Sequence, residues 1–250
     1  MYPIGRKIEI MKVADIHCHI LPGVDDGSRD MEQTMRMIET AYEEDIRLII
    51  ATPHYHIGKV KVNASVAMEY LEQVKTNIKN KYPDLKLYLG QEIYYYSEAM
   101  EDVDSGRAGT MASSSYVLME FSQDVSFIEI TDAVYDAISH GYSPVLAHIE
   151  RYGCLFGKYD RIEKLVESGA YLQVNASSVA GKHGHAEKSF IKKLLKKQYI
   201  SFVATDAHND TGRAPIMNEA VRTMEKICKP DYLLKVLWTN PLKIIDNEEI

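Results

Sequence analysis

Side chains that bind metal ions recur through this sequence, one or two at a time, directly after short apolar runs. The densest cluster comes first, where His17 and His19 alternate in the segment Asp-Ile-His-Cys-His. Near the other end, Asp206 and His208 alternate in the same way. Imidazoles and carboxylates are ligands that zinc, manganese and iron accept. If these positions meet in the fold, the sequence predicts a hydrolase with several metal ions in one centre.

More candidate ligands follow the other apolar runs. Taken singly, each is a weak indication, because a lone histidine at a strand end is more often a core or surface residue. Glu120 directly after an apolar run needs a partner, and a buried salt bridge is the alternative to a metal. Asp25 and Asp26 share a turn, so one of them can be structural. Nine residues together are hard to explain as packing: His17, His19, Asp26, His54, Glu92, Glu120, His148, Asp206 and His208.

Two arginines follow candidate ligands closely. Arg151 comes shortly after His148, and Arg213 shortly after His208. A guanidinium beside metal ions suits a phosphate substrate, because it offers paired hydrogen bonds and neutralises charge. The alternative is a salt bridge to a ligand carboxylate.

The elements that must position these side chains alternate between strand and helix. Such alternation implies parallel strands joined by crossover helices. Candidate ligands follow every expected strand except the sixth, and only a closed ring brings all those strand ends together. The sequence therefore predicts an α/β fold with a distorted seven-stranded (β/α)7 TIM-like barrel, rather than an open doubly wound sheet. The expected strands are residues 12–16, 47–52, 85–89, 116–119, 144–147, 170–174 and 200–204.

Residues 1–250 are expected to form one domain, with 1–11 as an N-terminal extension ahead of the first strand. Ser28 is a candidate cap for the first helix, and residues 177–187 are expected to form a surface loop. The net charge of −7 argues against nucleic acid as a partner. Three cysteines without a CxxC indicate a reducing compartment, so the cytoplasm is expected. Membrane insertion is not expected, because no apolar run reaches about 18 residues.

The motifs occur in an order that resembles the polymerase-and-histidinol-phosphatase (PHP) superfamily. More closely, the chain resembles the bacterial PHP protein-tyrosine phosphatases of capsule and exopolysaccharide loci. The runs at 21–27 and 147–152 point to this phosphatase branch, whereas the alternating histidines mark only the superfamily. The resemblance rests on residues 17–19, 25–27, 53–54, 90–95, 120–121, 147–152 and 206–208.

The resemblance implies a PHP fold with three divalent metal ions, manganese being the first expectation and iron or zinc the alternatives. Arg151 and Arg213 would bind the phosphoryl oxygens. The substrate would be phosphotyrosine on a cognate cytoplasmic tyrosine kinase that regulates polysaccharide export. The implied ligand sets are His17, His19, Glu92 and Asp206 for one ion, Glu92, Glu120 and His148 for the second, and Asp26, His54 and His208 for the third.

The same chemistry explains hydrolysis, because metal ions lower the pKa of bound water and the resulting hydroxide attacks phosphorus. No phosphocysteine is expected, since Arg161 follows Cys154 at the wrong spacing for a cysteine phosphatase. Two alternatives stay open: a small-molecule phosphatase such as histidinol phosphatase, and a non-catalytic metal-binding PHP module. His56, His183 and His185 have no assigned role.

Overall fold

The computed structural model describes residues 12–250, so the expected extension at 1–11 lies outside the described part of the chain. Strands and helices alternate as the sequence predicts. The strands are β1 (Val13–Cys18), β2 (Ile46–Ala51), β3 (His54–His56), β4 (Val60–Lys61), β5 (Lys86–Leu89), β6 (Glu92–Tyr94), β7 (Tyr116–Glu120), β8 (Ser143–Leu146), β9 (Tyr171–Asn175) and β10 (Phe202–Ala204). The helices are α1 (Met31–Glu43), α2 (Ala64–Ile78), α3 (Ala99–Asp104), α4 (Phe127–Ser139), α5 (Tyr159–Glu167), α6 (Ala176–Ala180), α7 (His185–Lys197), α8 (Asn218–Glu225), α9 (Pro230–Leu234) and α10 (Asn240–Asp246), with short helical turns η1 (Met111–Ser113), η2 (Ile149–Arg151) and η3 (Lys235–Thr239).

The strands form two sheets. One has the order β1-β2-β5 and the other β10-β9-β8-β7-β6-β3-β4. All paired strands are parallel except β3 and β4. Backbone hydrogen bonds from Asp206 N to His17 O and from His19 N to Ala207 O, both 2.8 Å, connect the end of β10 to the end of β1. The predicted α/β fold with parallel strands is therefore confirmed.

The described residues contain more strands than the seven expected, because two predicted strands are each followed by a second short one, β3 and β6, and the two-residue β4 pairs with β3. Pro53 separates β2 from β3, since proline has no N–H for a ladder hydrogen bond. Gly90 and Gln91 separate β5 from β6. The first halves of the two split strands pair with each other, β2 with β5, and so do the second halves, β3 with β6. The split places His54 and Glu92 at the start of separate strands.

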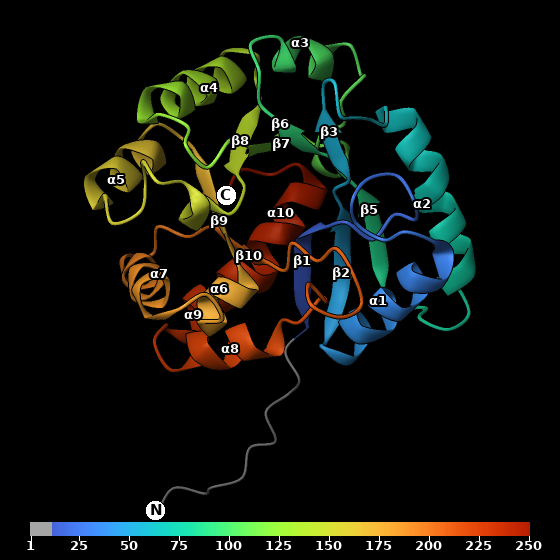
Figure 1. Cartoon of the computed structure of the whole chain (residues 1–250). Coiled ribbons are helices and arrows are strands. Elements are labelled where there is room, and N and C mark those ends of the chain that lie inside the picture. The colour runs from blue at the N-terminus through green and yellow to red at the C-terminus, as the bar shows by residue number, and fades with distance from the viewer. Residues whose placement is uncertain (1–11) are drawn as a thin grey trace, which may run out of the picture.

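Inward-facing side chains of several strands pack into one apolar cluster. Alternate residues contribute, such as Ala14 and Ile16 of β1, while Val13 and Ile49 face the helices instead. Strands buried on both faces are typical of parallel sheets covered by helices. Figure 1 shows the helices arranged around the strands, with α10 across the middle.

Helix α10 covers the end of the strands that is opposite to the candidate ligands. Its Ile244 belongs to the inner apolar cluster. Just after it, Asn247 accepts a hydrogen bond from Ser115 N, and Glu248 O accepts one from Tyr116 at the start of β7. The amino-terminal ends of the strands are thus covered, which leaves the carboxyl-terminal ends for chemistry.

Two local predictions were wrong. Asp30, not Ser28, caps α1, and its side chain accepts from Gln33 N at 2.8 Å. Ser28 instead bonds to Thr34. The segment 177–187, which was expected to be a loop, contains most of α6 and the start of α7. Gly181, with φ 88, ends α6 and leaves only a short turn between the two helices. Among the helices of residues 12–250, none is long and apolar enough to span a bilayer.

Candidate active site

His17 and His19 are fully buried at the carboxyl end of β1 and approach each other through their Nε2 atoms, 3.2 Å apart. Nδ1 of His17 lies 3.2 Å from Gln173 Oε1, and Nδ1 of His19 lies 2.7 Å from Asp25 Oδ2. When each Nδ1–H is donated to its oxygen partner, both Nε2 atoms present lone pairs toward the same point. Two lone pairs at this distance call for a cation between them.

The two aspartates of the turn have different surroundings. The Asp25 side chain is buried and accepts hydrogen bonds from Gly27 N, His54 N and the ring of His19. Asp26 is more exposed, and its Oδ1 lies 3.3 Å from His54 Nε2 and 3.5 Å from His208 Nε2. Asp25 therefore orients the turn and one histidine, while Asp26 faces the site.

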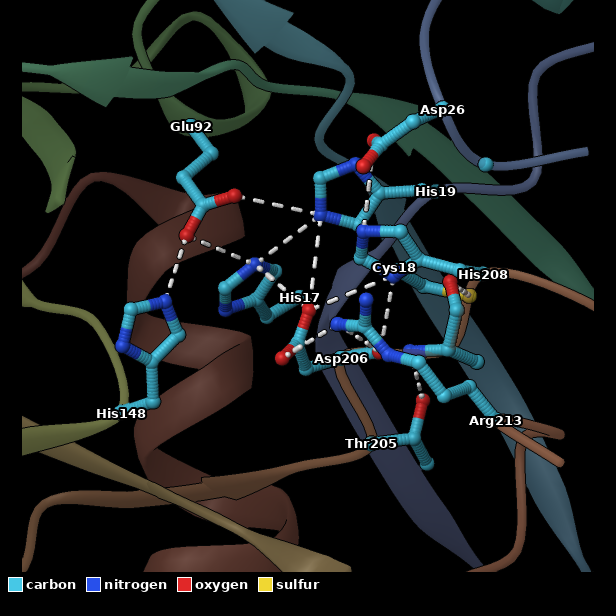
Figure 2. Close-up of polar contacts among 12 residues, drawn as sticks. His17, Cys18, His19, Asp26, Glu92, His148, Thr205, Asp206, His208 and Arg213 are labelled. Atoms are coloured by element: carbon cyan, nitrogen blue, oxygen red, sulfur yellow. Dashed lines mark hydrogen bonds and ion pairs between the residues drawn. The ribbon is translucent and has the colours of Figure 1, made fainter. Parts of the chain in front are cut away.

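Glu92 of β6 is buried, and its carboxylate faces His17, His19 and His148 (Figure 2). Its Oε1 is 3.0 Å from His148 Nε2 and 3.2 Å from His17 Nε2. Its Oε2 is 3.2 Å from His19 Nε2 and 3.0 Å from His54 Nδ1. A carboxylate with imidazoles at both oxygens has the geometry of a bridging ligand.

Glu120, at the end of β7, extends the cluster on the side of His148. Its Oε1 lies 3.4 Å from His148 Nε2, and its Oε2 lies 3.6 Å from His54 Nδ1. With Glu120, all nine candidate ligands predicted from the sequence lie in one cluster. Within the described residues, three groups have ligand atoms that all lie within 4.8 Å of one another: His19, Asp26, His54 and His208; His17, His19 and Glu92; and His54, Glu92 and Glu120.

These residues fit divalent metal ions. The buried Oε2 of Glu92 lies close to two imidazole nitrogens but makes no hydrogen bond, which is costly unless a cation satisfies it. The donors are imidazole nitrogens and carboxylate oxygens, the mixture that manganese, iron and zinc accept. His19 and His54 each belong to two of these groups, and His148 and Asp206 belong to none, so the groups differ from the three sets that the resemblance implies.

Without metal, neighbouring carboxylates raise the pKa of two buried histidines, His19 and His148. Burial alone would lower the pKa of His19, but Asp25 and Glu92 raise that pKa to about 9. Burial would also lower the pKa of His148, but Glu120 and Glu92 raise that pKa to about 9. The pKa of buried Glu92 lies well below its ordinary value, because the surrounding histidines outweigh its desolvation. Metal ions entering this site would displace protons.

Asp206 connects the candidate ligands to both arginines. Its Oδ1 lies 3.5 Å from His17 Nε2 and 3.6 Å from His19 Nε2. Its Oδ2 accepts from Arg151 Nη2 at 2.8 Å and from Arg213 Nη2 at 2.9 Å. The salt bridges that were the alternative for the arginines are thus present. A guanidinium has five N–H donors, more than one carboxylate oxygen accepts, so both arginines keep donors for an anion.

The sequence analysis missed two residues that hold the ligands in place. Gln173 of β9 accepts from His148 N at 2.7 Å as well as facing His17, and donates to Asn175 Oδ1 at 2.9 Å. Asn175 Nδ2 donates to Asp206 Oδ2 at 3.0 Å. Both amide side chains are buried. One sequence signal could have found them: Gln173 and Asn175 alternate at the end of 170–174, the one expected strand without a candidate ligand.

The remaining histidines lie outside the cluster. His56 stacks on Tyr94 with ring centroids 4.1 Å apart. His140 caps the end of α4, and its Nδ1 bonds to Asp136 O at 2.9 Å. His183 bonds to Ser177 Oγ at 3.0 Å, and His185 begins α7. None of these four belongs to the candidate metal groups of the described residues.

The chain resembles proteins of known activity over nearly its whole length. It is 32% identical to the tyrosine-protein phosphatase CpsB of Streptococcus pneumoniae, over 94% of this chain and 99% of that protein. It is 35% identical to the tyrosine-protein phosphatase YwqE of Bacillus subtilis, over 85% and 84% of the two chains.

Solved structures agree with these relatives. One solved structure belongs to a set described as YwqE from Bacillus subtilis and CpsB from Streptococcus pneumoniae, metal-dependent tyrosine phosphatases. It has a TM-score of 0.89 at 33% identity, and the match covers 95% of this chain and 96% of that one. Histidinol phosphate phosphatase of Lactococcus lactis shares the fold, with a TM-score of 0.59 at 16% identity over 86% of this chain and 94% of that one. The model of the family described as "Capsular polysaccharide synthesis, CpsB/CapC" matches residues 13–246. This chain therefore belongs to the CpsB/CapC family of capsular polysaccharide synthesis proteins.

Proposed function

We propose that this protein is a metal-dependent protein-tyrosine phosphatase. The observation that carries the proposal is Asp206, whose two oxygens face candidate metal ligands on one side and two guanidiniums on the other. Metal ions and arginines side by side suit a phosphoryl group, which carries negative charge on three oxygens. Relatives covering nearly the whole chain are tyrosine-protein phosphatases, which supports tyrosine as the phosphorylated residue.

The proposed cofactors are three divalent metal ions, with manganese the first candidate. When bound, they supply an activated water molecule and positive charge beside the phosphoryl group. Glu92 would bridge two of the ions, because both of its oxygens face imidazoles. The proposed ligands are His17, His19, Asp26, His54, Glu92, Glu120, His148, Asp206 and His208.

The protein's own residues bind and orient the substrate. Arg151 and Arg213 donate their remaining N–H groups to the phosphoryl oxygens, where negative charge is stabilised during transfer. The phenolate leaving group is stable enough that it needs little proton donation. The three cysteines take no part, and burial raises the pKa of Cys18 well above its ordinary value.

The fold proposed around the site is a closed, distorted seven-stranded barrel in a single domain. Counting β2 with β3 and β5 with β6, and leaving out the antiparallel edge strand β4, gives the seven strands, and the hydrogen bonds between the ends of β1 and β10 support the closure. Closure explains why ligands from six strand ends share one site. The proposed compartment is the cytoplasm, supported by three free thiols.

The proposed partner is a phosphotyrosine protein, specifically a cognate tyrosine kinase of polysaccharide synthesis or export. The family to which the chain belongs supports the connection with capsule. Purified protein should therefore hydrolyse p-nitrophenyl phosphate and a phosphotyrosine peptide when manganese is added. A chelator should abolish both activities, and iodoacetamide should leave them unchanged.

Substrate preference is tested by comparing catalytic efficiency on the phosphotyrosine peptide with that on histidinol phosphate. A higher value for histidinol phosphate would replace the proposal by the small-molecule alternative. Metal binding without hydrolysis of either substrate would support the non-catalytic module. Activity that survives exhaustive chelation but is lost to iodoacetamide would contradict metal-dependent hydrolysis altogether.

A further inference from the structure

A cavity of about 420 Å³ opens beside the two arginines of the candidate active site. It lies between α6 with the loop that follows it and the loop that carries Arg213. Figure 2 shows Arg213 beside Asp206, with Thr205 close by, and all three residues line the cavity. We call it the arginine cavity, and its lining includes Arg151, Asn175, Ala180, Lys182, Asp206, Arg213, Ile216 and Glu219.

The walls of the arginine cavity differ in character. At its inner end, Arg151 and Arg213 share the Oδ2 atom of Asp206. Small or apolar side chains also line it, Ala176 and Ala180 from α6 and Ala214 and Ile216 from the facing loop, together with the polar Ser177, His183 and Thr211. The outer rim carries an ion pair of 2.6 Å between Lys182 and Glu219, which are both about half exposed.

This order of groups selects a class of ligand. An anionic end is favoured at the guanidiniums, and a flat apolar body is favoured between the alanines and Ile216. Both carboxylates of the lining, Asp206 and Glu219, are already paired with cations. An amino group, such as that of histidinol phosphate, therefore meets no free carboxylate in this cavity. An aryl phosphate suits both the guanidiniums and the apolar walls, and an aminoalkyl phosphate suits only the guanidiniums.

We infer that the arginine cavity is the aryl subsite of the enzyme, which holds the phenyl ring of a phosphotyrosine side chain. The phosphoryl group points to Arg151 and Arg213, and the peptide backbone leaves past Lys182 and Glu219 at the rim. The inference rests on the proposed function and adds the position of the ring and the walls that select it.

Two substitutions change the cavity without removing a proposed ligand or arginine. Ala180→Leu adds apolar atoms from the α6 wall, and Ile216→Ala removes them from the opposite wall. Each should raise KM for a phosphotyrosine peptide about tenfold or more, since small changes in an apolar pocket have effects of this size. Ala186→Leu is the matched control, because Ala186 is exposed on α7 and does not line the cavity.

The decisive comparison uses inorganic phosphate as a competitive inhibitor of the same variants. Phosphate occupies the anionic end alone, so its inhibition constant should stay within about twofold of the wild-type value while KM for the peptide rises. Unchanged KM in both variants would overturn the inference, because the ring would then lie elsewhere. An equal rise of KM and of the phosphate inhibition constant would also overturn it, since the substitutions would then act through the arginines.

Failure of the proposed function would look different. The wild-type protein would then fail to hydrolyse phosphotyrosine peptide at all. Failure of the aryl subsite alone leaves wild-type hydrolysis intact and removes only the selective effect of the two variants.

Discussion

The side chain of Gln173 and the backbone of His148 are joined by a hydrogen bond of 2.7 Å, although the two residues belong to different strand ends. His148 has φ 31, in the left-handed region, which costs on the order of 1–3 kcal/mol for a residue other than glycine. The same oxygen of Gln173 faces Nδ1 of His17. One amide oxygen thus orients two proposed ligands.

Replacing Gln173 by methionine should weaken metal binding. The substitution preserves volume but removes the acceptor that orients His17 and His148, and losses of about 10- to 100-fold in metal affinity are usual for such partners. Calorimetric titration with manganese measures the change, and Gln33→Met is the control, because Gln33 is also buried but bonds to Asp210. Wild-type affinity in Gln173→Met would mean that packing alone orients the histidines.

Replacing Arg151 or Arg213 by alanine should reduce kcat by about 10²- to 10³-fold, as loss of a donor to a developing anion does. Metal content, measured by elemental analysis, should stay at the wild-type level. Arg47→Ala serves as the control, since Arg47 pairs with Asp84 away from the candidate ligands. If metal is lost from the variants, the arginines act by holding Asp206 rather than substrate.

Metal binding should raise thermal stability, because an ion that binds only the folded state adds about 2.7 kcal/mol at a hundredfold excess over its Kd. Thermal unfolding with chelator, and then with manganese, iron or zinc, measures this and ranks the metals. Glu92→Gln should lose most of the increase, since Glu92 contacts four of the histidines. Equal melting temperatures with and without metal would argue against a resident metal centre.

The metal-free protein should lose stability as the pH rises. Burial lowers the pKa of His19 and His148, but neighbouring carboxylates raise both to about 9, above the ordinary value of 6.5. Their contribution is fully present below about pH 6.5 and is lost as the pH rises through about 9. Asp206 has the opposite pH dependence, because its pKa is lowered from 3.8. Its stabilising contribution is present above about pH 3.8 and is lost only in acid. Thermal unfolding in chelator from pH 6 to pH 9 checks this, and His148→Ala should show a smaller decline.

The sequence predicted the cluster better than its surroundings. The nine candidate ligands could be found because each has a distinctive residue type directly after an apolar run, and a ring of parallel strands brings such ends together. The separate strands β3 and β6 were not anticipated, because a proline or glycine between two extended segments leaves the local pattern almost unchanged. Asp30 was not anticipated as the cap, because serine and aspartate both fit that position and Ser28 comes first in the sequence.

Gln173, Asn175 and Asp25 could not be assigned roles in advance. The partners of Gln173 and Asn175 are distant in sequence, and an amide on a strand has many possible partners. The role of Asp25 depends on which carboxylate of its turn points inward. Salt bridges of Arg151 and Arg213 were expected as an alternative to phosphate binding. The sequence did not predict that both arginines contact one oxygen of Asp206, because this depends on the path of the loop that carries Arg213.

If Asp206 is a metal ligand, its divided carboxylate would make the affinities for cofactor and substrate interdependent. A cation at Oδ1 would draw charge from Oδ2 and weaken its hydrogen bonds to the two guanidiniums, which would then bind an incoming anion more strongly. Thermodynamic reciprocity requires the converse, so that phosphate must tighten metal binding by the same factor by which metal tightens phosphate binding. The enzyme would hold its ions most firmly while it is occupied, and would be most easily stripped of them between turnovers.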